Sequence, residues 1–146
     1  MSKRKIQKLK KLADDAKKNE QPLSNDPMFA SRLAQIEIDL QNLEITNLRT
    51  LASVDNGEAP GAESSIIKIL GSEIEQVIDN LTRKSLGKRA FVNEPDALSA
   101  GYNGAEVFPK AAAYASGKYF NHRKKSIYAG SNEIQKNIIS KLMLNL

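Results

Sequence analysis

The sequence predicts an all-α protein, an up-down four-helix bundle with extra short helices. Apolar residues recur every three or four positions over long stretches, as they do along the buried side of a helix. Glycine, proline and asparagine cluster between these stretches, where turns are expected. No stretch reads as a credible strand. The chain has 146 residues, so we expect residues 1–146 to form a single domain.

The first two expected helices are separated by a polar loop. The first spans about residues 3–18, with lysines opposite its apolar side. Residues 19–27 should form a loop that ends in a helix cap, with Pro27 at the first helical position. The second helix then extends to about Ser53. Two apolar stripes predict two buried faces, or one face toward a partner: Leu33, Ile36, Leu40 and Leu43 in one, Ile38, Ile45, Leu48 and Leu51 in the other.

Two breakers, Asn56-Gly57 and Pro60-Gly61, should close the second helix and turn the chain back. A third helix is expected over about residues 62–86, with Gly87 as its left-handed C-terminal cap. Gly71 falls within this helix, where it suggests close contact with a neighbouring helix. The expected buried stripe consists of Ile67, Leu70, Ile74, Val77, Ile78 and Leu81.

The rest of the chain is expected to begin with an irregular connection. Residues 88–109 show no clean period, although a helical turn near Asp96–Ala100 is possible. Helical segments should follow Pro109 and include residues 119–125. Gly130 then breaks the chain, and Ser131 or Asn132 can cap a last helix. The apolar side of that helix holds Ile134, Ile138, Ile139, Leu142 and Leu146.

Composition excludes several kinds of site. The chain has no cysteine and one histidine, which rules out disulfide frameworks, zinc ligand sets and Cys–His nucleophile pairs. His122 lies among basic residues, where a surface or helix-end position is expected. Apolar runs fall far short of the roughly 20 residues that cross a bilayer, and no secretory signal is present. We therefore expect no metal site, no membrane contact and a cytoplasmic location.

Basic residues are concentrated at both ends of the chain. Residues 1–20 hold eight Lys and Arg against three Asp and Glu, and residues 110–146 hold seven against Glu133 alone. The segment between them carries an excess of acidic residues. Two interpretations are open. The basic ends could neutralise nucleic-acid phosphates, or they are solvated helix faces and complementary packing surfaces, which is the interpretation we favour.

One segment is more specific than this pattern of helices. Residues 125–139 read KSIYAGSNEIQKNII, which resembles the C-terminal signature of the acyl-CoA dehydrogenase family. Residues 38–49, Pro60–Leu81 with Lys68 and Gly71, and Leu86-Gly87 resemble the family more loosely, so that most of residues 3–146 is covered. The resemblance does not include the N-terminal helical domain or the middle β-domain of the family. The resemblance therefore implies the C-terminal bundle of a flavin-dependent enzyme, standing alone.

The resemblance also implies a cofactor and a reaction. Complete enzymes of this family perform α,β-dehydrogenation of acyl-CoA thioesters, with FAD accepting the hydride. Gly130, Ser131 and Glu133 are the positions expected to contact FAD, which would be shared with absent domains and a neighbouring subunit. Homo-oligomers or a complementing acyl-CoA dehydrogenase subunit are the implied partners. From the residues alone, Ser131 is equally a helix cap and Glu133 a first-turn acid, although a phosphate could sit at this helix start.

Departures from the family limit the expected activity. Many members carry a catalytic glutamate where this chain has Ala129, whose methyl group cannot accept a proton. Other members place the base on an earlier helix, upstream of Met1. The family's glycine turn is reduced to Gly87-Lys88-Arg89-Ala90. We therefore assign no catalytic residue and expect the chain to be inactive alone.

Two other functions remain open. The first is a non-catalytic module that dimerises through the second and last helices. The second, which we regard as weaker, is nucleic-acid binding through the basic ends, where Tyr119, Phe120 and Tyr128 interleave with basic residues.

Overall fold

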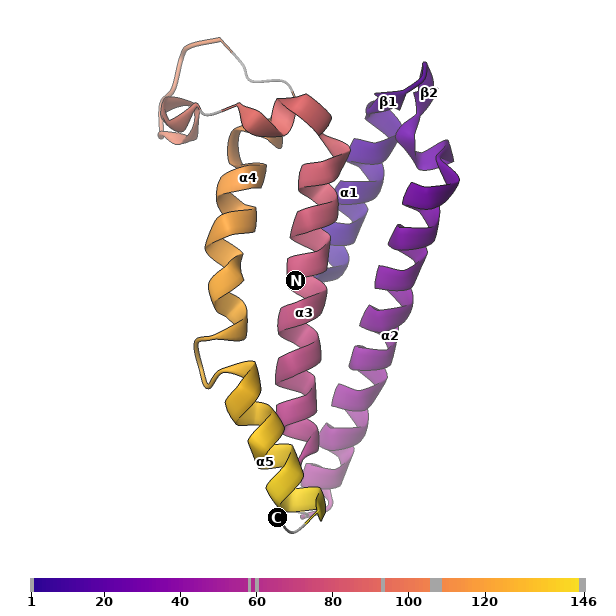
Figure 1. Cartoon of the computed structure of the whole chain (residues 1–146), viewed down its shortest axis with the longest axis vertical. Helices are drawn as coiled ribbons and strands as arrows, with labels where there is room; N and C mark the ends of the chain where they lie inside the picture. The colour runs from indigo at the N-terminus through magenta and orange to yellow at the C-terminus, as the bar shows by residue number, and fades with distance from the viewer. Residues whose placement is uncertain (1, 58, 60, 93, 106–108, 145–146) are drawn as a thin grey trace.

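The computed structural model describes residues 2–57, 59, 61–92, 94–105 and 109–144, and within them it is an all-α bundle (Figure 1). Its α-helices are α1 (Ser2–Asp15), α2 (Pro27–Asp55), α3 (Glu63–Ser85), α4 (Ala112–Asn121) and α5 (Asn132–Leu144). Short 3₁₀ helices connect them: η1 (Leu23–Asn25), η2 (Gly87–Phe91), η3 (Pro95–Leu98) and η4 (His122–Ser126). The direction of the chain alternates from α1 to α4, and α5 continues the course of α4 (Figure 1). The expected up-down bundle is confirmed.

The turn between α1 and α2 contains a small strand pair that the sequence analysis did not expect. Strands β1 (Lys17–Lys18) and β2 (Gln21–Pro22) are antiparallel, so α1 ends a few residues earlier than predicted. Helix α2 begins as predicted. The Asp26 side chain accepts a hydrogen bond from the Phe29 N–H at 3.0 Å, and Pro27 occupies the first turn. This cap satisfies an N–H group that has no partner within the helix.

The main core lies where α1, α2 and α3 meet. Its buried members are Ile6, Leu9, Ala13, Phe29, Ile36, Ile74, Ile78 and Leu81. A second cluster joins α1 to α4 through the turn that follows α3: Leu12, Leu86, Ala90, Ala112 and Ala115. The predicted apolar side of the first helix is therefore correct. It contributes Ile6, Leu9 and Ala13 to the first cluster and Leu12 to the second.

Within the described part of this chain α2 buries one of its two apolar faces, which leaves the expected alternative of a face toward a partner. Ile36 is buried, and Leu33, Leu40 and Leu43 pack against the core. The second stripe is open, with Ile38, Ile45, Leu48 and Leu51 each at least 50% exposed. Helix α2 can bury only the stripe that faces α1 and α3. Periodicity identified both stripes correctly but could not reveal that no other described segment covers the second one.

The buried stripe predicted for α3 is only partly correct, and the apolar side of α5 is largely exposed in this chain. Val77 and Leu70 on α3 are substantially exposed, and so are Ile134, Ile138 and Leu142 on α5. Among the described residues of α5, only Asn132 is buried. Pro60 and Leu146, named above as a breaker and a stripe member, lie outside the described residues.

The remaining turn predictions hold. Gly57 and Gly87 have the positive φ angles of +87° and +55° that favour glycine after a helix. Residues 88–109 are irregular where described, with a short 3₁₀ turn at η3 near the expected position. A methyl group added at Gly71 would lie an ordinary 3.7 Å from Leu43 of α2. The two helices are therefore close at this point, but they leave room for an alanine.

Candidate functional site

A left-handed turn connects η4 to α5 and presents the first candidate residues. Ala129 and Gly130 have consecutive positive φ angles of 57° and 83°. This conformation costs about 1 kcal/mol at Ala129 and little at Gly130. A β-carbon at Gly130 would also lie 2.6 Å from Nε2 of Gln135. Both turn residues are exposed. We call residues 127–133 the junction.

The side chains of Ser131 and Glu133 form hydrogen bonds at the start of α5. The Ser131 hydroxyl accepts a hydrogen bond from the Ile134 N–H at 3.3 Å, so the expected cap is present. The exposed Glu133 carboxylate interacts with its own N–H group and with the Ser131 hydroxyl, and these hydrogen bonds lower its pKa from the ordinary value of 4.5. A negative charge therefore already lies at the positive end of the helix dipole. This arrangement favours hydrogen-bond donors over the phosphate that we considered from sequence.

Asn132 anchors the junction to α3. Its buried side-chain oxygen accepts hydrogen bonds from the Lys68 ammonium at 2.8 Å and from the Ser72 hydroxyl at 3.3 Å. The sequence analysis identified Asn132 only as a possible cap and did not assign this role. The signal that was available is weak: Lys68 and Ser72 are polar residues four apart on a helix rich in isoleucine. Their partner lies 60 or more residues away.

An ionic cluster lies under η4, just before the junction. The Lys125 ammonium pairs with Glu75, and the ring nitrogen Nδ1 of His122 contacts the Asp79 carboxylate. Lys5 of α1 lies 3.5 Å from Glu75 and 3.7 Å from Asp79. Burial, and then the nearby charge of Lys5, lower the pKa of Lys125 from its ordinary value even though Glu75 is adjacent. We call these five side chains the ionic cluster.

His122 is therefore at a helix end, as expected, but not at the surface. It caps α4, and its side chain is 15% exposed. The side-chain amide of Gln76 on α3 donates to the backbone oxygens of His122 and Arg123, each at 3.2 Å. Together with the ionic cluster, these bonds fix the segment that leads into the junction.

The aromatic residues near η4 are only partly free. The guanidinium groups of Arg83 and Arg123 lie over the Tyr119 ring, 4.6 Å and 4.4 Å from its centroid. Cation–π contacts of this kind occupy the ring surface on which a base would otherwise stack. Phe120 and Tyr128 are exposed.

A basic cleft forms at the opposite end of α4 from the junction. It encloses about 590 Å³ between the β1–β2 turn, the end of α3 and η2. Lys84, Lys88 and Arg89 line it from one side and Lys17 and Lys18 from the other, with Asp15 as the acidic lining residue. Lys88 and Arg89 are both exposed and lie in η2, directly after the end of α3. Folding brings them next to basic residues about 70 positions earlier, which no local pattern could indicate.

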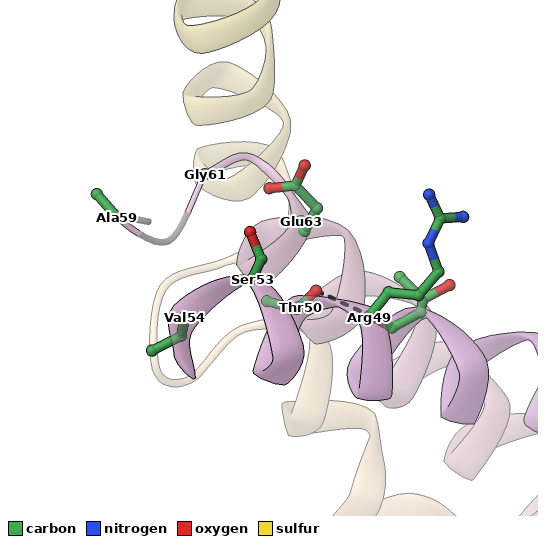
Figure 2. A pocket seen from close by; sticks show the side chains of 8 residues that line it. Arg49, Thr50, Ser53, Val54, Ala59, Gly61 and Glu63 are labelled. Atoms are coloured by element: carbon green, nitrogen blue, oxygen red, sulfur yellow. Dashed lines mark hydrogen bonds between the residues drawn. The ribbon is translucent and has the colours of Figure 1, made fainter. Parts of the chain in front are cut away.

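Another cavity, of about 410 Å³, lies between the end of α2 and the start of α3 (Figure 2). Arg49, Thr50 and Glu63 line it. The Thr50 hydroxyl donates to the backbone oxygen of Thr46 at 3.0 Å, as the dashed line in Figure 2 indicates. The cavity contains none of the candidate residues. We assign it no chemistry.

The fold and the site define a class of protein, namely an all-α bundle whose last helix begins at an exposed left-handed turn. The family model described as "Acyl-CoA dehydrogenase, C-terminal domain" matches residues 1–144. The chain therefore belongs to the acyl-CoA dehydrogenase family, as its C-terminal domain. The resemblance of residues 125–139 is confirmed.

Solved structures share the bundle at low identity. A complex of FAD with PigA is 16% identical, with a TM-score of 0.73, over 96% of this chain and 32% of that chain. The ChsE4–ChsE5 complex from Mycobacterium tuberculosis is 20% identical, with a TM-score of 0.73, over 99% and 35%. An electron-transferring flavoprotein of Acidaminococcus fermentans is 11% identical, with a TM-score of 0.75, over 99% and 33%. At these identities the likeness establishes the fold alone.

This chain spans about a third of the length of these structures. The search of curated proteins found no match. Within the described residues, no helix combines the length and apolar character needed to span a bilayer.

Proposed function

We propose that residues 1–146 form the C-terminal bundle domain of a flavin-dependent oxidoreductase similar to acyl-CoA dehydrogenases. The complete enzyme would perform α,β-dehydrogenation of acyl-CoA thioesters, and this domain would contribute to FAD binding and to oligomer contacts. The family match over residues 1–144 carries this proposal. The exposed junction is consistent with it, since Gly130 and Glu133 are open to a ligand.

The junction would contact FAD through hydrogen-bond acceptors. Glu133 is an exposed carboxylate with a lowered pKa, and carboxylates accept charge-assisted hydrogen bonds from hydroxyl and amino groups. Ser131 and the exposed backbone at Gly130 complete this contact. FAD, when bound, supplies the acceptor for a hydride. The junction residues would only bind and orient it.

The basic cleft would take phosphate groups. Lys84, Lys88 and Arg89 converge there with Lys17, and a concave basic surface attracts phosphates more strongly than a flat one. A dinucleotide shared between protomers would bring its diphosphate to such a cleft. Lys88 and Arg89 would therefore contact phosphate groups.

We propose that the chain alone does not turn over acyl-CoA. Ala129 offers only a methyl group where many family members have their base. The base would then lie on another part of a longer protein or on a complementing subunit. The cofactor would likewise be shared with those parts.

Isothermal titration with FAD tests the binding role. We expect weak, saturable binding to the chain and about tenfold weaker binding of FMN, which lacks the adenylate. Glu133→Gln should weaken binding of FAD, whereas Glu63→Gln, in the first turn of α3, is the matched control and should not. Equal loss in both variants, or no binding at all, would contradict a role for the junction.

A second titration tests the basic cleft. Lys88→Gln combined with Arg89→Gln should weaken FAD binding and reduce its dependence on salt. Lys136→Gln combined with Lys141→Gln removes the same charge from α5 and serves as control. The reaction itself is tested with a complementing acyl-CoA dehydrogenase subunit: normal assembly in which acyl-CoA leaves the flavin oxidised would refute it.

A non-catalytic dimerisation module is the second candidate function. The observation in its favour is the open stripe of α2, whose members include Ile45 and Leu48. Contiguous exposed apolar surface of this kind marks interaction sites. Sedimentation velocity with and without FAD separates the two functions. A dimer that Ile45→Asp dissociates and that never binds FAD would favour the module over the flavin domain.

Nucleic-acid binding is the weakest candidate, and we propose no such role. The guanidinium groups of two arginines lie over the Tyr119 ring, so this ring offers no free surface for a nucleic-acid base to stack on. Strongly salt-dependent binding in a filter assay would contradict this view.

A further inference from the structure

One side of α1 carries cations for which the described part of the chain supplies no acidic partner. Arg4, Lys8 and Lys11 are exposed, and their spacing of four and three positions places them on one face of the helix. Lys118 of α4 lines the same cleft as Lys8 and Lys11. Among the described residues, no ion pair joins any of these four cations to a carboxylate. We call these four residues the basic face.

Other lysines of α1 do have acidic partners. Lys3 and Lys10 pair with Glu44 and Glu37 of α2, at 2.6 Å and 2.7 Å. The basic face instead places like charges three and four positions apart on one helix, where they repel each other. Acidic groups from outside the chain would remove this repulsion.

The cleft beside the basic face offers little apolar surface. Leu9 and Ile78 line it and are each 1% exposed, and Leu12 is 8% exposed. The cleft encloses about 260 Å³, which is less than the roughly 300–1,000 Å³ of sites that enclose small molecules. A partner would therefore rest on the charged side chains at the surface and would not enter the cleft.

We propose that the basic face docks an acidic helix of another protein. Arg4, Lys8 and Lys11 span two turns of α1, with about 5–6 Å between neighbouring β-carbons. Carboxylates at positions i, i+4 and i+7 of a second helix repeat this spacing, so that charges can pair along two helices that lie side by side. Lys118 would add a contact from α4.

Two other anionic partners fit the basic face less well. Helices that rest on a membrane insert large apolar side chains, and none of the described residues of α1 is an exposed side chain of this kind. Binders of single-stranded nucleic acid offer free aromatic rings. The ring beside the basic face is that of Tyr114, and the Lys118 ammonium lies 5.5 Å from its centroid.

Asp15 limits the basic face at one end. It lies four positions after Lys11, is exposed and lines the same cleft. It would therefore repel a carboxylate at the next position of the partner helix. Asp15→Asn should strengthen docking about twofold to threefold, whereas Asp14→Asn, which removes the same charge from another side of α1, should change it less.

The proposal does not depend on the flavin function. No residue of the basic face is among those proposed to contact FAD, and the test requires no cofactor. The competing explanation is that these cations are a solvated helix face that keeps the protein soluble. That explanation predicts attraction to any anion, without dependence on the spacing of the carboxylates.

The test is a titration of the full chain into a labelled alanine-based helical peptide, followed by fluorescence anisotropy at low ionic strength. The peptide carries three glutamates at positions i, i+4 and i+7. A second peptide of the same composition has its glutamates distributed around the helix, and circular dichroism confirms that both peptides are helical. We expect saturable binding that weakens with added salt and is at least about tenfold tighter for the first peptide.

Matched double variants and NMR locate the docked peptide. Lys8→Gln combined with Lys11→Gln should lower the affinity about tenfold, whereas Lys136→Gln combined with Lys141→Gln should leave it unchanged. Circular dichroism confirms that both variants keep the fold, and amide shifts should centre on α1 and α4.

Several results would overturn the proposal. Absence of saturable binding, equal affinity for the two peptides, equal loss in the two double variants, or shifts centred on the basic cleft would each do so. Tighter binding of vesicles of phosphatidylcholine and phosphatidylserine, or of a uridine oligonucleotide, would assign the basic face to a membrane or to RNA instead.

Discussion

Replacement of Ile36 by alanine, compared with the same replacement at Ile45, tests how this bundle is stabilised. Both isoleucines lie on α2, so helix propensity changes equally at the two positions. Ile36 is 2% exposed within the main core, while Ile45 is 50% exposed on the open stripe. The pair therefore isolates the effect of burial.

The expected magnitudes follow from these exposures. Truncating a fully buried isoleucine to alanine costs about 2–5 kcal/mol, because burial is lost and a cavity remains. We expect about 3 kcal/mol for Ile36→Ala, which corresponds to a fall in Tm of roughly 10 °C for a chain of this size. At Ile45 about half of the burial is at stake, or roughly 1 kcal/mol. Part of that is offset by the higher helix propensity of alanine.

Urea unfolding followed by circular dichroism at several protein concentrations measures both variants. The midpoint should fall for Ile36→Ala while the slope stays constant, which indicates a change in stability alone. Equal losses at the two positions, independent of concentration, would refute the assignment of the open stripe. A loss at Ile45 that appears only at high concentration would instead indicate association through that stripe.

Three further outcomes are expected. Gly130→Ala should destabilise the chain by about 1 kcal/mol, because its φ angle of +83° is strained for a residue with a β-carbon. Gly117→Ala, in the open interior of α4, should stabilise it by about 0.4–1 kcal/mol in the same thermal assay. Asn132→Ala should cost about 1–3 kcal/mol, since Lys68 loses a hydrogen-bond acceptor, and an unchanged Tm would argue against the anchor. For Asp26, the hydrogen bond from Lys18, then that from the N–H group of α2, lowers the pKa below its ordinary 3.8. Its stabilising effect is present above that value and is lost as pH falls through the lower pKa, so the acid unfolding curve of Asp26→Asn should be less steep there.

Local patterns were enough to predict the helices and their ends. Asp26 and Pro27 mark the start of α2, Gly87 marks the end of α3, and Ser131 caps α5, all through interactions within a few residues. Such features depend only on backbone geometry and nearest neighbours, which the order of residues along the chain determines.

Burial was harder to predict, because periodicity reports what a helix face could bury and not what lies opposite. Ile45 and Val77 fit their stripes as well as Ile36 and Ile78 do, yet only the latter pair is buried. Whether a second chain covers the exposed stripes does not follow from the periodicity of one chain.

The candidate site was predictable only in part. The motif predicts the left-handed glycine and the serine cap. It does not predict that the Glu133 carboxylate bonds to its own N–H group, which makes hydrogen-bond donors, and not phosphates, the preferred ligand groups. Asn132 and the ionic cluster depend on contacts between residues more than 40 positions apart. Contacts at this separation leave no periodic trace in the sequence.

The ionic cluster also restricts how the helices can slide past one another. Aliphatic contacts between α1 and α3 would tolerate a displacement along their axes, since one leucine replaces another with little loss. A displacement of α1 by one turn moves Lys5 by about 5.4 Å, which would separate its buried ammonium from Glu75 and Asp79. Because an unmatched charge away from water is costly, we expect the cluster to select one alignment of α1, α3 and η4 from several that hydrophobicity alone would allow.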